Sequence, residues 1–312
     1  MIYYSFIIPH YNTPKLLYRL LDSIPQREDI EIIVVDDNSD IDQKANVTRP
    51  DVKIIFLDSL QSKGAGRARN IGMNAAKGRW LLFADSDDFY KPGFIKVLDE
   101  YKDDNIDILF FNVDTVDSDT LLPGIDRTAL EQKITNQYDG SKESSDEILF
   151  LRWGPWRKML NREFVVNYSF SYEEIPNGND VLFSLETSYF AEKWKVDKRI
   201  VYSLTYRKGS ITYSNLSKKK YSTTINNMMR RNQFFKYIGH SDWVSSFFHK
   251  GYIRSVTLYI LHNIRIRPSK GIEIFFYFIT HFISIHKGAN YYIDVINEIK
   301  DRMNCKKGGK NR

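Results

Sequence analysis

The sequence contains a single cysteine, and this scarcity excludes a disulfide-stapled fold. Cys305 lies in a polar, basic tail, so the composition favours a reducing cytosol. The chain also lacks any apolar run approaching the ~20 residues that span a bilayer. The first predicted strand begins almost at Met1, so we expect no signal peptide.

Several ligand-binding motifs are missing as well. No Gly-x-Gly-x-x-Gly follows the first predicted strand, which disfavours a dinucleotide oxidoreductase. Gly64-Ala65-Gly66 follows the third strand and has the wrong spacing. The histidines suggest no independent metal site, although His10 could touch a nucleotide. No segment resembles an RNA- or DNA-binding motif.

The most informative segment present is 80–88, WLLFADSDD. An apolar run long enough for one buried strand ends in Asp85, Asp87 and Asp88. Such closely spaced carboxylates repel one another unless a cation compensates them, and their oxygens suit Mg²⁺ or Mn²⁺. The alternative is a polar turn in which Asp87 or Asp88 caps the next helix.

The first 115 residues alternate strand-like and helix-like patterns. One helix is expected to start at Thr13-Pro14, a second to span Arg67–Lys77 with Gly78 as its stop, and a third to start at Pro92. Strands are predicted at 5–8, 30–35, 52–57, 80–84 and 106–113. This alternation predicts an α/β fold with a mostly parallel sheet covered by helices on both faces.

Polar groups follow three of these strands. Tyr11 and Asn12 follow the first, Asp36 and Asp37 the second, and the 85–88 cluster the fourth. Ligands of open α/β sheets bind beyond the carboxyl ends of the strands. We therefore expect one site at this edge.

Those segments resemble the family 2 glycosyltransferases of the GT-A (Rossmann-like) fold. Order and spacing match from residue 3 to about 115, and further matches extend the resemblance to about 213. The matching segments are FIIPHYN (6–12), VVDDNS (34–39), GRARNIG (66–72), FADSDD (83–88), WRKML (156–160), NGNDVLF (177–183) and YRKGSIT (206–212).

The resemblance implies a nucleotide-sugar site. Pro9, Tyr11 and Asn12 would surround base and ribose, with the Tyr11 ring facing the base. Asp37 would accept a hydrogen bond from the uracil imide, which favours a UDP-sugar, while Asp36 would fix the turn.

The resemblance also implies a metal site. Asp85 would face ribose and metal, Ser86 would lie with the donor, and Asp87 would hold the Mn²⁺ or Mg²⁺ that bridges the diphosphate. Asp88 would support this shell or cap a helix. Arg67 and Arg69 would meet phosphate; alternatively, Arg69 pairs with Asp36 or Asp85 without touching a ligand.

Asp180 is the candidate general base. One-step displacement at an anomeric carbon requires a base opposite the leaving group. This base should therefore come from a different segment than the acids that would bind the metal. Asn179 stands where Glu is commoner in the family, and Glu173 and Glu174 are competing bases. Asp180 could also be a helix N-cap, which is compatible with catalysis.

The acceptor side is less defined. Lys158, Trp156 and Asn179 are its candidate residues, with Trp156 either a sugar platform or core. Trp153 is expected in the core. The polar segment 117–146 is expected to be a variable excursion without chemistry.

Charge divides the chain near residue 214. Residues 215–312 hold 18 of the 45 Lys and Arg but only 5 of the 39 Asp and Glu, a net charge of +13, whereas residues 1–214 carry −7. Residues 215–312 are also aromatic-rich with a helical pattern. They either lie on an anionic membrane, with 272–285 the best insertion candidate, or pack as core with a basic face.

We therefore expect two domains. Residues 1–214 form the GT-A catalytic domain, with 1–115 binding the nucleotide-sugar and 116–214 on the acceptor side; residues 215–312 form a helical, basic region.

The expected function is inverting transfer of a sugar from a UDP-sugar to a glycan acceptor, which would be lipid-linked and belong to capsule, O-antigen or exopolysaccharide assembly. The enzyme would lie in the bacterial cytoplasm, peripheral on the inner membrane face, without nucleic acid. The alternatives are a non-catalytic nucleotide-sugar or carbohydrate binder and a nucleic-acid-binding protein acting through 215–312.

Overall fold

The computed structural model describes residues 1–175, 177–207, 227 and 230–240. The chain separates into two compact units, Met1–Ser214 and Asn215–Arg312. In the second unit, residues 230–237 are helical. The proposed insertion segment 272–285 lies outside the described residues, so the interfacial reading stays a prediction. None of the helices in the described ranges combines the length and hydropathy required to span a bilayer.

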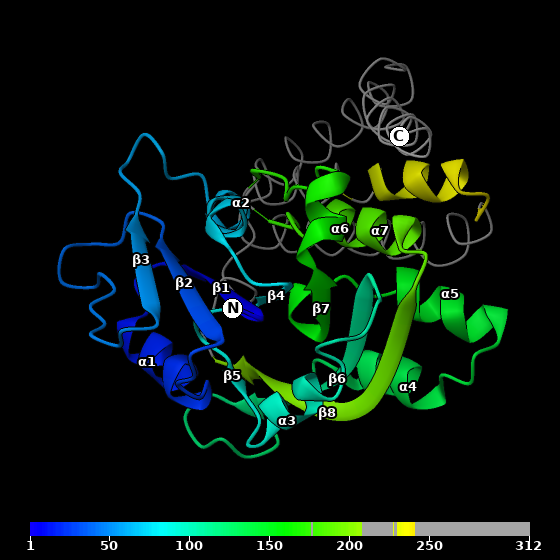
Figure 1. Cartoon of the computed structure of the whole chain (residues 1–312), viewed down its shortest axis with the longest axis horizontal. Helices are drawn as coiled ribbons and strands as arrows, with labels where there is room; N and C mark the ends of the chain where they lie inside the picture. The colour runs from blue at the N-terminus through cyan, green and yellow to red at the C-terminus, as the bar shows by residue number, and fades with distance from the viewer. Residues whose placement is uncertain (176, 208–226, 228–229, 241–312) are drawn as a thin grey trace, which may run out of the picture. The chain divides into compact units, whose positions relative to one another are not determined.

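An eight-stranded sheet organises the first unit, with the order β3-β2-β1-β4-β7-β6-β8-β5 (Figure 1). β1, β2, β3 and β4 are mutually parallel, and β6 is parallel to β8. β7 runs antiparallel between β4 and β6, and β5 is antiparallel to β8. The predicted mostly parallel sheet is confirmed. The strands are β1 Tyr4–His10, β2 Ile30–Asp36, β3 Val52–Phe56, β4 Trp80–Phe83, β5 Phe89–Tyr90, β6 Ile108–Asp117, β7 Lys158–Asn161 and β8 Trp194–Tyr206.

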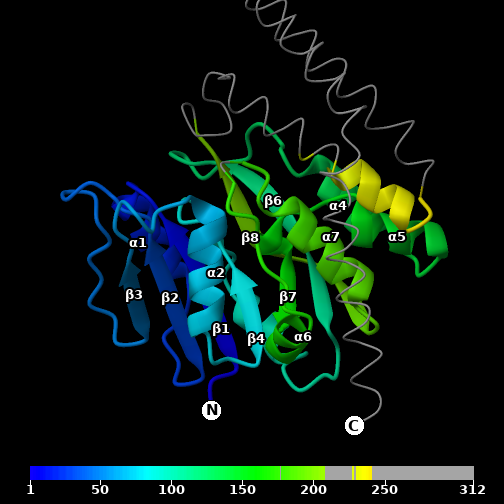
Figure 2. The ribbon, with the colours of Figure 1, turned by 90° about the horizontal axis from the view of Figure 1, so that it is seen from above.

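Helices cover both faces of this sheet. α2, α6 and α7 lie on one face and α1 and α3 on the other (Figures 1 and 2). The expected excursion at 117–146 contains two helices that the sequence did not predict, α4 and the first half of α5. The helices are α1 Pro14–Ser23, α2 Ala65–Ala75, α3 Phe94–Asp99, α4 Ala129–Gln137, α5 Lys142–Phe150, α6 Arg162–Asn167 and α7 Val181–Phe190, with a 3₁₀ turn η1 at Pro155–Arg157.

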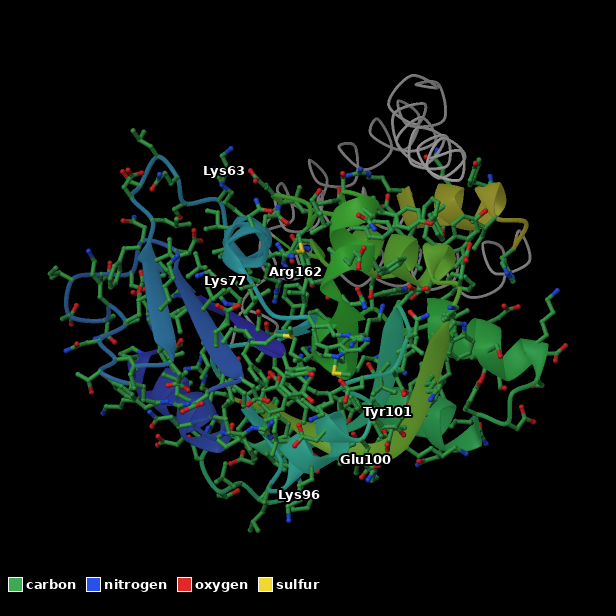
Figure 3. All side chains as sticks on the ribbon, viewed as in Figure 1. Lys63, Lys77, Lys96, Glu100, Tyr101 and Arg162 are labelled. Atoms are coloured by element: carbon green, nitrogen blue, oxygen red, sulfur yellow. The ribbon has the colours of Figure 1, made fainter. Side chains whose placement is uncertain are left out.

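Gly78 is not the stop signal of α2 that the sequence suggested. The helix already ends at Ala75, with Ala76 extended. A Cβ at Gly78 would lie 2.6 Å from Ser5 Oγ and 2.8 Å from the Ser5 backbone nitrogen. The glycine is therefore required by close approach to β1 rather than by helix termination. Arg162, labelled beside Lys77 in Figure 3, holds the same helix end by donating to the Ala76 carbonyl at 2.8 Å.

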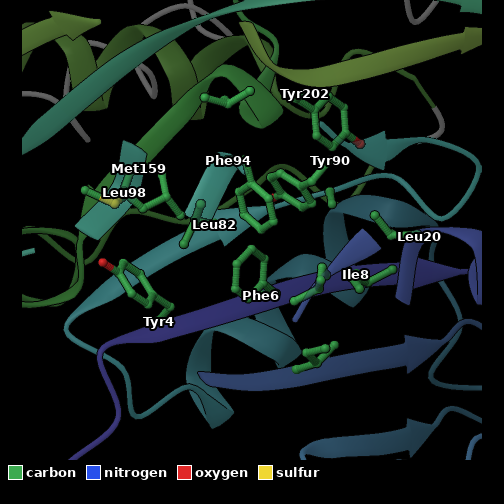
Figure 4. Packing of buried hydrophobic residues seen from close by; sticks show 14 of the residues in the cluster. Tyr4, Phe6, Ile8, Leu20, Leu82, Tyr90, Phe94, Leu98, Met159 and Tyr202 are labelled. Atoms are coloured by element: carbon green, nitrogen blue, oxygen red, sulfur yellow. The ribbon is translucent and has the colours of Figure 1, made fainter. Parts of the chain in front are cut away.

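The core follows the alternation of side chains along the strands. Phe6 of β1 points to the face covered by α1 and α3, where it meets Tyr90 and Phe94 edge-on at 5.3 and 6.0 Å (Figure 4). The neighbouring Ile7 points to the α2 face, where a Cβ on Gly72 would come within 2.6 Å of Ile7 Cγ2. α2 therefore lies close to the strands that carry the candidate site.

Candidate active site

The loops that follow β1, β2 and β4 meet at one edge of the sheet, as the parallel strands require. Asn12, after β1, donates its backbone N–H to Ser39 Oγ, after β2, at 3.0 Å. Thr13 occupies the N-cap position of α1 and Pro14 the first helical position, as expected, although the Thr13 side chain makes no capping bond. Its hydroxyl instead pairs with Ser86 Oγ at 3.0 Å. The predicted convergence of the three loops is thus present.

The first two loops are interlocked by Asn12. Its side-chain amide donates to Asp40 Oδ2 at 2.9 Å, and its oxygen accepts the Asp40 backbone N–H at 2.9 Å. Asn12 has a positive φ of 51°, which turns the chain sharply after Tyr11. Tyr11 remains 54% exposed, so its ring is open to stack on a base, and Pro9 lies half-buried in β1.

Asp37 is the one acid of the β2 loop that is ready to bind a ligand. It is 8% exposed, and its Oδ2 accepts the backbone N–H of Gly64 at 2.9 Å. Its Oδ1 is buried and has no hydrogen-bond partner among the described residues. A buried carboxylate oxygen without a donor is costly, so Asp37 fits a ligand that brings an N–H group.

His10 and Asp36 face each other beneath these loops. Their side chains are 1% and 0% exposed, with Nδ1 and Oδ2 2.8 Å apart. The sequence allowed a contact between His10 and a nucleotide. His10 is too buried to make that contact directly. Burial alone would raise the pKa of Asp36, but hydrogen bonds from Ser39, Ala45 and His10 lower it below its usual value. The prediction that Asp36 fixes a turn agrees with these bonds.

Asp88 anchors the acidic loop (residues 85–88) to the sheet. It is 4% exposed and accepts the Tyr202 hydroxyl at 3.0 Å and the Thr205 backbone N–H at 2.7 Å, both from β8. The Tyr202 oxygen also accepts the Asp85 backbone N–H at 2.9 Å. Asp88 does not cap α3, which begins only after Gly93. It fixes the loop instead.

Asp87 is the acid with the weakest compensation. Its backbone carbonyl is held by Thr205 Oγ1 at 2.7 Å and by Arg19 Nη2 at 2.5 Å. Its carboxylate meets Arg207 only at 4.0 Å. Burial, followed by repulsion from Asp85, raises the pKa of Asp87. A carboxylate destabilised in this way would gain from a cation, so the site fits a divalent metal.

The number of acids also suits such a metal. In the described ranges, no group of three or more His, Cys, Asp or Glu is placed to hold an ion by itself. Mg²⁺ commonly uses only one or two carboxylates and completes its shell with water and substrate phosphates. Asp87 and Asp85 could therefore hold a metal that arrives with a diphosphate.

Arg69 connects the two sides of the site. It is 6% exposed, donates to Asp85 at 2.6 Å and to Asn179 Oδ1 at 2.8 Å, and lies over the Tyr172 ring at 5.4 Å. Burial acts to lower its pKa, but Asp85, Tyr172 and Asp180 together raise it above its usual value. The pairing with Asp85 that the sequence left open is present, whereas a phosphate contact stays a prediction.

The loop before α7 is held against α2. Asn70 donates to the Tyr172 carbonyl at 2.9 Å and accepts the Tyr172 N–H at 2.7 Å. A Cβ on Gly66 would lie 2.0 Å from the Glu173 carbonyl oxygen. Arg67 and Lys63 pair with Glu174 at 2.9 and 3.2 Å, and Figure 3 labels Lys63. α2 therefore positions the acceptor-side loop.

Asp180 lies at the N-cap position of α7 but makes no side-chain capping bond there. Burial raises its pKa, against the opposing influence of Arg69, and a raised pKa favours a proton acceptor near neutral pH. The competing Glu174 differs: although partial burial opposes it, Arg67 and Lys63 lower its pKa. The directions of these two pKa shifts favour Asp180 over Glu174 as the candidate base.

Lys158 lies behind this helix rather than in the open site. It is 2% exposed, and its Nζ donates to Ser184 Oγ at 2.5 Å and Ser188 Oγ at 3.2 Å. Burial lowers the pKa of Lys158 well below its usual range. We infer that it positions α7, and with it Asp180.

Trp156 is half-buried, stacks parallel to Tyr202 with ring centroids 6.2 Å apart, and packs against the core. Both readings of this residue, platform and core, remain compatible with its position. Trp153 donates its indole N–H to the Phe150 carbonyl at 3.0 Å.

Sequence reasoning missed the residues that hold the acidic loop, namely Tyr202, Thr205 and Arg19. Tyr202 and Thr205 lie in an ordinary β8 pattern more than 110 residues after Asp88. Only the pairing of strands brings them together. Of these three residues, Tyr202 and Thr205 offered a sequence signal, because they are polar positions within the apolar end of β8. Arg19 offered none.

The chain is similar to known glycosyltransferases. Residues 5–154 match the family described as glycosyl transferase family 2. The chain is 26% identical over 219 residues to the putative glycosyltransferase EpsH of Bacillus subtilis. This match covers 66% of this chain and 62% of EpsH. This chain thus spans less than two thirds of the length of that relative.

Two further proteins extend the comparison. Over 89 residues, covering 28% of this chain and 36% of the relative, the chain is 37% identical to WfaP of Escherichia coli, a UDP-Glc:alpha-D-GlcNAc-diphosphoundecaprenol beta-1,3-glucosyltransferase. The crystal structure of Staphylococcus aureus TarS 1–349 in complex with UDP-GlcNAc superposes with a TM-score of 0.56 at 20% identity, covering 78% of this chain and 74% of TarS 1–349. This likeness establishes the fold.

Proposed function

Because the chain belongs to glycosyltransferase family 2, we propose that it transfers a sugar from a UDP-sugar to a hydroxyl group of a glycan acceptor. The WfaP relative is named for a UDP-glucose donor, and the TarS crystal structure contains UDP-GlcNAc. These relatives support a hexosyl or N-acetylhexosaminyl donor of the UDP type.

The observation that carries the donor proposal is the buried, unpartnered Oδ1 of Asp37. The imide N–H of uracil would satisfy it, whereas cytosine and adenine offer no donor at the matching atom. Tyr11, 54% exposed on the adjacent loop, would stack on the same base. The pocket therefore suits a uridine nucleotide.

The acidic loop would bind the diphosphate together with its metal. Asp87 and Asp85 are the residues that would hold Mn²⁺ or Mg²⁺, which when bound would neutralise charge on the departing UDP. Tyr202, Asp88 and Thr205 keep the loop in place through the bonds described above.

Asp180 would act as the general base. Its carboxylate would accept the proton of the acceptor hydroxyl as that oxygen forms its bond to the anomeric carbon, while the bond to the diphosphate oxygen breaks on the opposite side. One such displacement inverts the anomeric configuration. Lys158, bonded to Ser184, and Arg69, bonded to Asn179, keep this segment in position.

The acceptor is proposed to be a lipid-linked glycan in bacterial surface polysaccharide assembly. The diphosphoundecaprenol acceptor in the name of WfaP supports this class. Residues 215–312, with a net charge of +13, would bring the enzyme to the anionic inner face of the membrane. Deleting them should release the protein from anionic liposomes; unchanged association would contradict this part of the proposal.

Calorimetric titration with UDP tests the proposal most directly. We expect binding in the presence of Mn²⁺, loss of most affinity in EDTA, and weaker binding of CDP under the same conditions. Folded protein that binds no UDP with either metal would contradict the donor assignment. Screening UDP-sugars for hydrolysis would then identify the transferred sugar.

A further inference from the structure

We propose that His10 is a positioning residue that joins the two walls of the nucleobase pocket. The inference rests on the proposed UDP-sugar function and concerns how its pocket is built. One wall is the 11–13 loop after β1, and the other is the 37–45 loop after β2. His10 touches neither solvent nor the expected ligand position, yet each of its ring nitrogens serves one wall.

The hydrogen bonds fix the tautomer of the His10 ring. Nε2 lies 3.3 Å from the backbone nitrogen of Thr13, which can only donate, so Nε2 must accept. Nδ1 therefore carries the hydrogen and donates to Asp36 Oδ2 at 2.8 Å. A neutral ring with the hydrogen on Nδ1 is the arrangement that satisfies both partners.

Asp36 transmits this link to the second wall. Its Oδ1 accepts the Ser39 backbone N–H at 2.8 Å, and its Oδ2 accepts that of Ala45 at 3.1 Å. The intervening Asp37 donates its own N–H to the His10 carbonyl at 2.8 Å. The bond between His10 and Asp36 therefore positions the carboxylate of Asp37 that would bind uracil.

Thr13 transmits the link to the first wall. It stands at the N-cap position of α1 and pairs through its hydroxyl with Ser86 of the acidic loop at 3.0 Å. Only Tyr11 and Asn12 lie between Thr13 and His10, so fixing both ends restricts the stacking ring of Tyr11. The Thr13 side of His10 therefore governs affinity for any base.

Two isosteric variants separate the two links. His10→Asn retains a donor near Nδ1 and loses the Thr13 bond, so UDP and CDP should both bind about 5- to 10-fold more weakly with their affinity ratio unchanged. His10→Gln retains an acceptor near Nε2 and loses the Asp36 bond, so the preference for UDP over CDP should fall by about 10-fold. Changes of this size correspond to one hydrogen bond.

Tyr101→Phe is the matched control. It removes one tertiary hydrogen bond, from Tyr101 to Asp197 at 2.9 Å, away from the strand carboxyl ends (Figure 3). It should leave both nucleotide affinities at their wild-type values. Folded His10→Asn and His10→Gln proteins with wild-type UDP affinity and wild-type UDP/CDP preference would overturn the inference.

The ring itself provides a second test that needs no variant to fold. Five further histidines lie in residues 215–312, so the His10 imidazole ¹⁵N signals are identified in the full-length protein by through-bond assignment from the His10 backbone. We expect the Nδ1–H tautomer, with and without UDP. An Nε2–H tautomer would overturn the inference, whereas wild-type protein that binds no UDP would instead contradict the proposed function.

Discussion

The two sides of the site are held in different ways. The nucleobase walls are joined to the ends of β1 and β2 through His10 and Asp36, whose bonds lie inside the sheet edge. The acceptor-side loop packs through the Tyr172 ring against Phe83 of β4, with ring centroids 5.1 Å apart. Its tethers in the described part of the chain come largely from α2, through Arg69 and Asn70.

We therefore expect the two sides of the site to contribute to different steps, nucleotide binding and turnover. The residues of the proposed base pocket are already held in place by these bonds, so they would select the nucleotide at little conformational cost. The acceptor loop depends on a helix of the nucleotide-binding half, and Arg69 of that helix also holds Asp85. Changes at α2 should therefore alter turnover, whereas changes at His10 should alter nucleotide binding.

The largest expected effect is that of Asp180→Asn on the acceptor side. Removing the proton acceptor should lower kcat by about 10²- to 10⁴-fold, while the UDP dissociation constant stays within about twofold of wild type. Steady-state kinetics and calorimetry check both. Glu174→Gln is the matched control and should cost far less, because Glu174 is engaged by Arg67 and Lys63. A fully active Asp180→Asn enzyme would move the base to Glu173 or Glu174.

Asp87→Ala should remove metal-dependent nucleotide binding on the donor side. Without this carboxylate the affinity gained on adding Mn²⁺ should vanish, a loss of about 100-fold, because the repulsion between Asp85 and Asp87 is what a cation relieves. Calorimetry with and without EDTA measures it. Asp119→Ala, an exposed acid on a neighbouring loop, should bind UDP as wild type does. Normal metal-dependent affinity in Asp87→Ala would contradict the metal assignment.

The acid limb of the kcat/KM profile should report the raised pKa of Asp180. The base must be unprotonated, so activity falls about tenfold per pH unit below that pKa and levels off above it. The limb should therefore lie at higher pH than that of an ordinary Asp, whose pKa is about 3.9. UDP binding measured without acceptor is the control and should not follow this limb. A limb at or below the ordinary range would argue against Asp180.

Asn70→Ala should sharpen the contrast between the two sides. It removes both bonds to Tyr172, so kcat should fall by about 10-fold as the acceptor loop loosens, at a cost of about 1–2 kcal/mol in stability. UDP affinity should remain near wild type, opposite to the His10 variants. Tyr101→Phe again serves as control. A change in UDP affinity with unchanged kcat would reverse the proposed division.

The smallest effect is a gain in stability from Asp87→Asn without metal. Because the folded-state pKa of Asp87 is raised, its ionisation lowers the stability of the fold as the pH rises above the unfolded-state pKa, and the loss is complete above the folded-state pKa. In EDTA at neutral pH the variant should melt about 2–4 °C higher, roughly 1 kcal/mol, and the difference should disappear below the ordinary Asp range. A lower melting temperature at neutral pH would contradict this reading.

The strand ends of residues 1–115, the proposed nucleotide-binding half, could be predicted closely because their signals are local. Apolar runs followed by Tyr11, Asp37 and Asp87 mark strand ends, and parallel strands must place these ends together. Helix and strand bounds moved by only a few residues. The helices of 117–146 were missed because their polar sequences carry only weak apolar periodicity.

The supporting residues could not be predicted in the same way. Gly78 looked like a helix stop, but its nearness to Ser5 is set by packing across the sheet. His10 looked like a possible ligand contact, but its burial against Asp36 follows from the register of β1 and β2. Both depend on contacts between segments distant in sequence.

The sequence by itself determined the fold class, the family and the types of side chain at the sheet edge, because periodicity and residue spacing are local properties. Tertiary structure decided which acids are satisfied and which are not. Asp88 is bonded to β8 and Asp36 to His10, whereas Asp37 and Asp87 keep unsatisfied capacity. Burial and partner geometry, which arise only when distant strands pair, separate otherwise identical carboxylates.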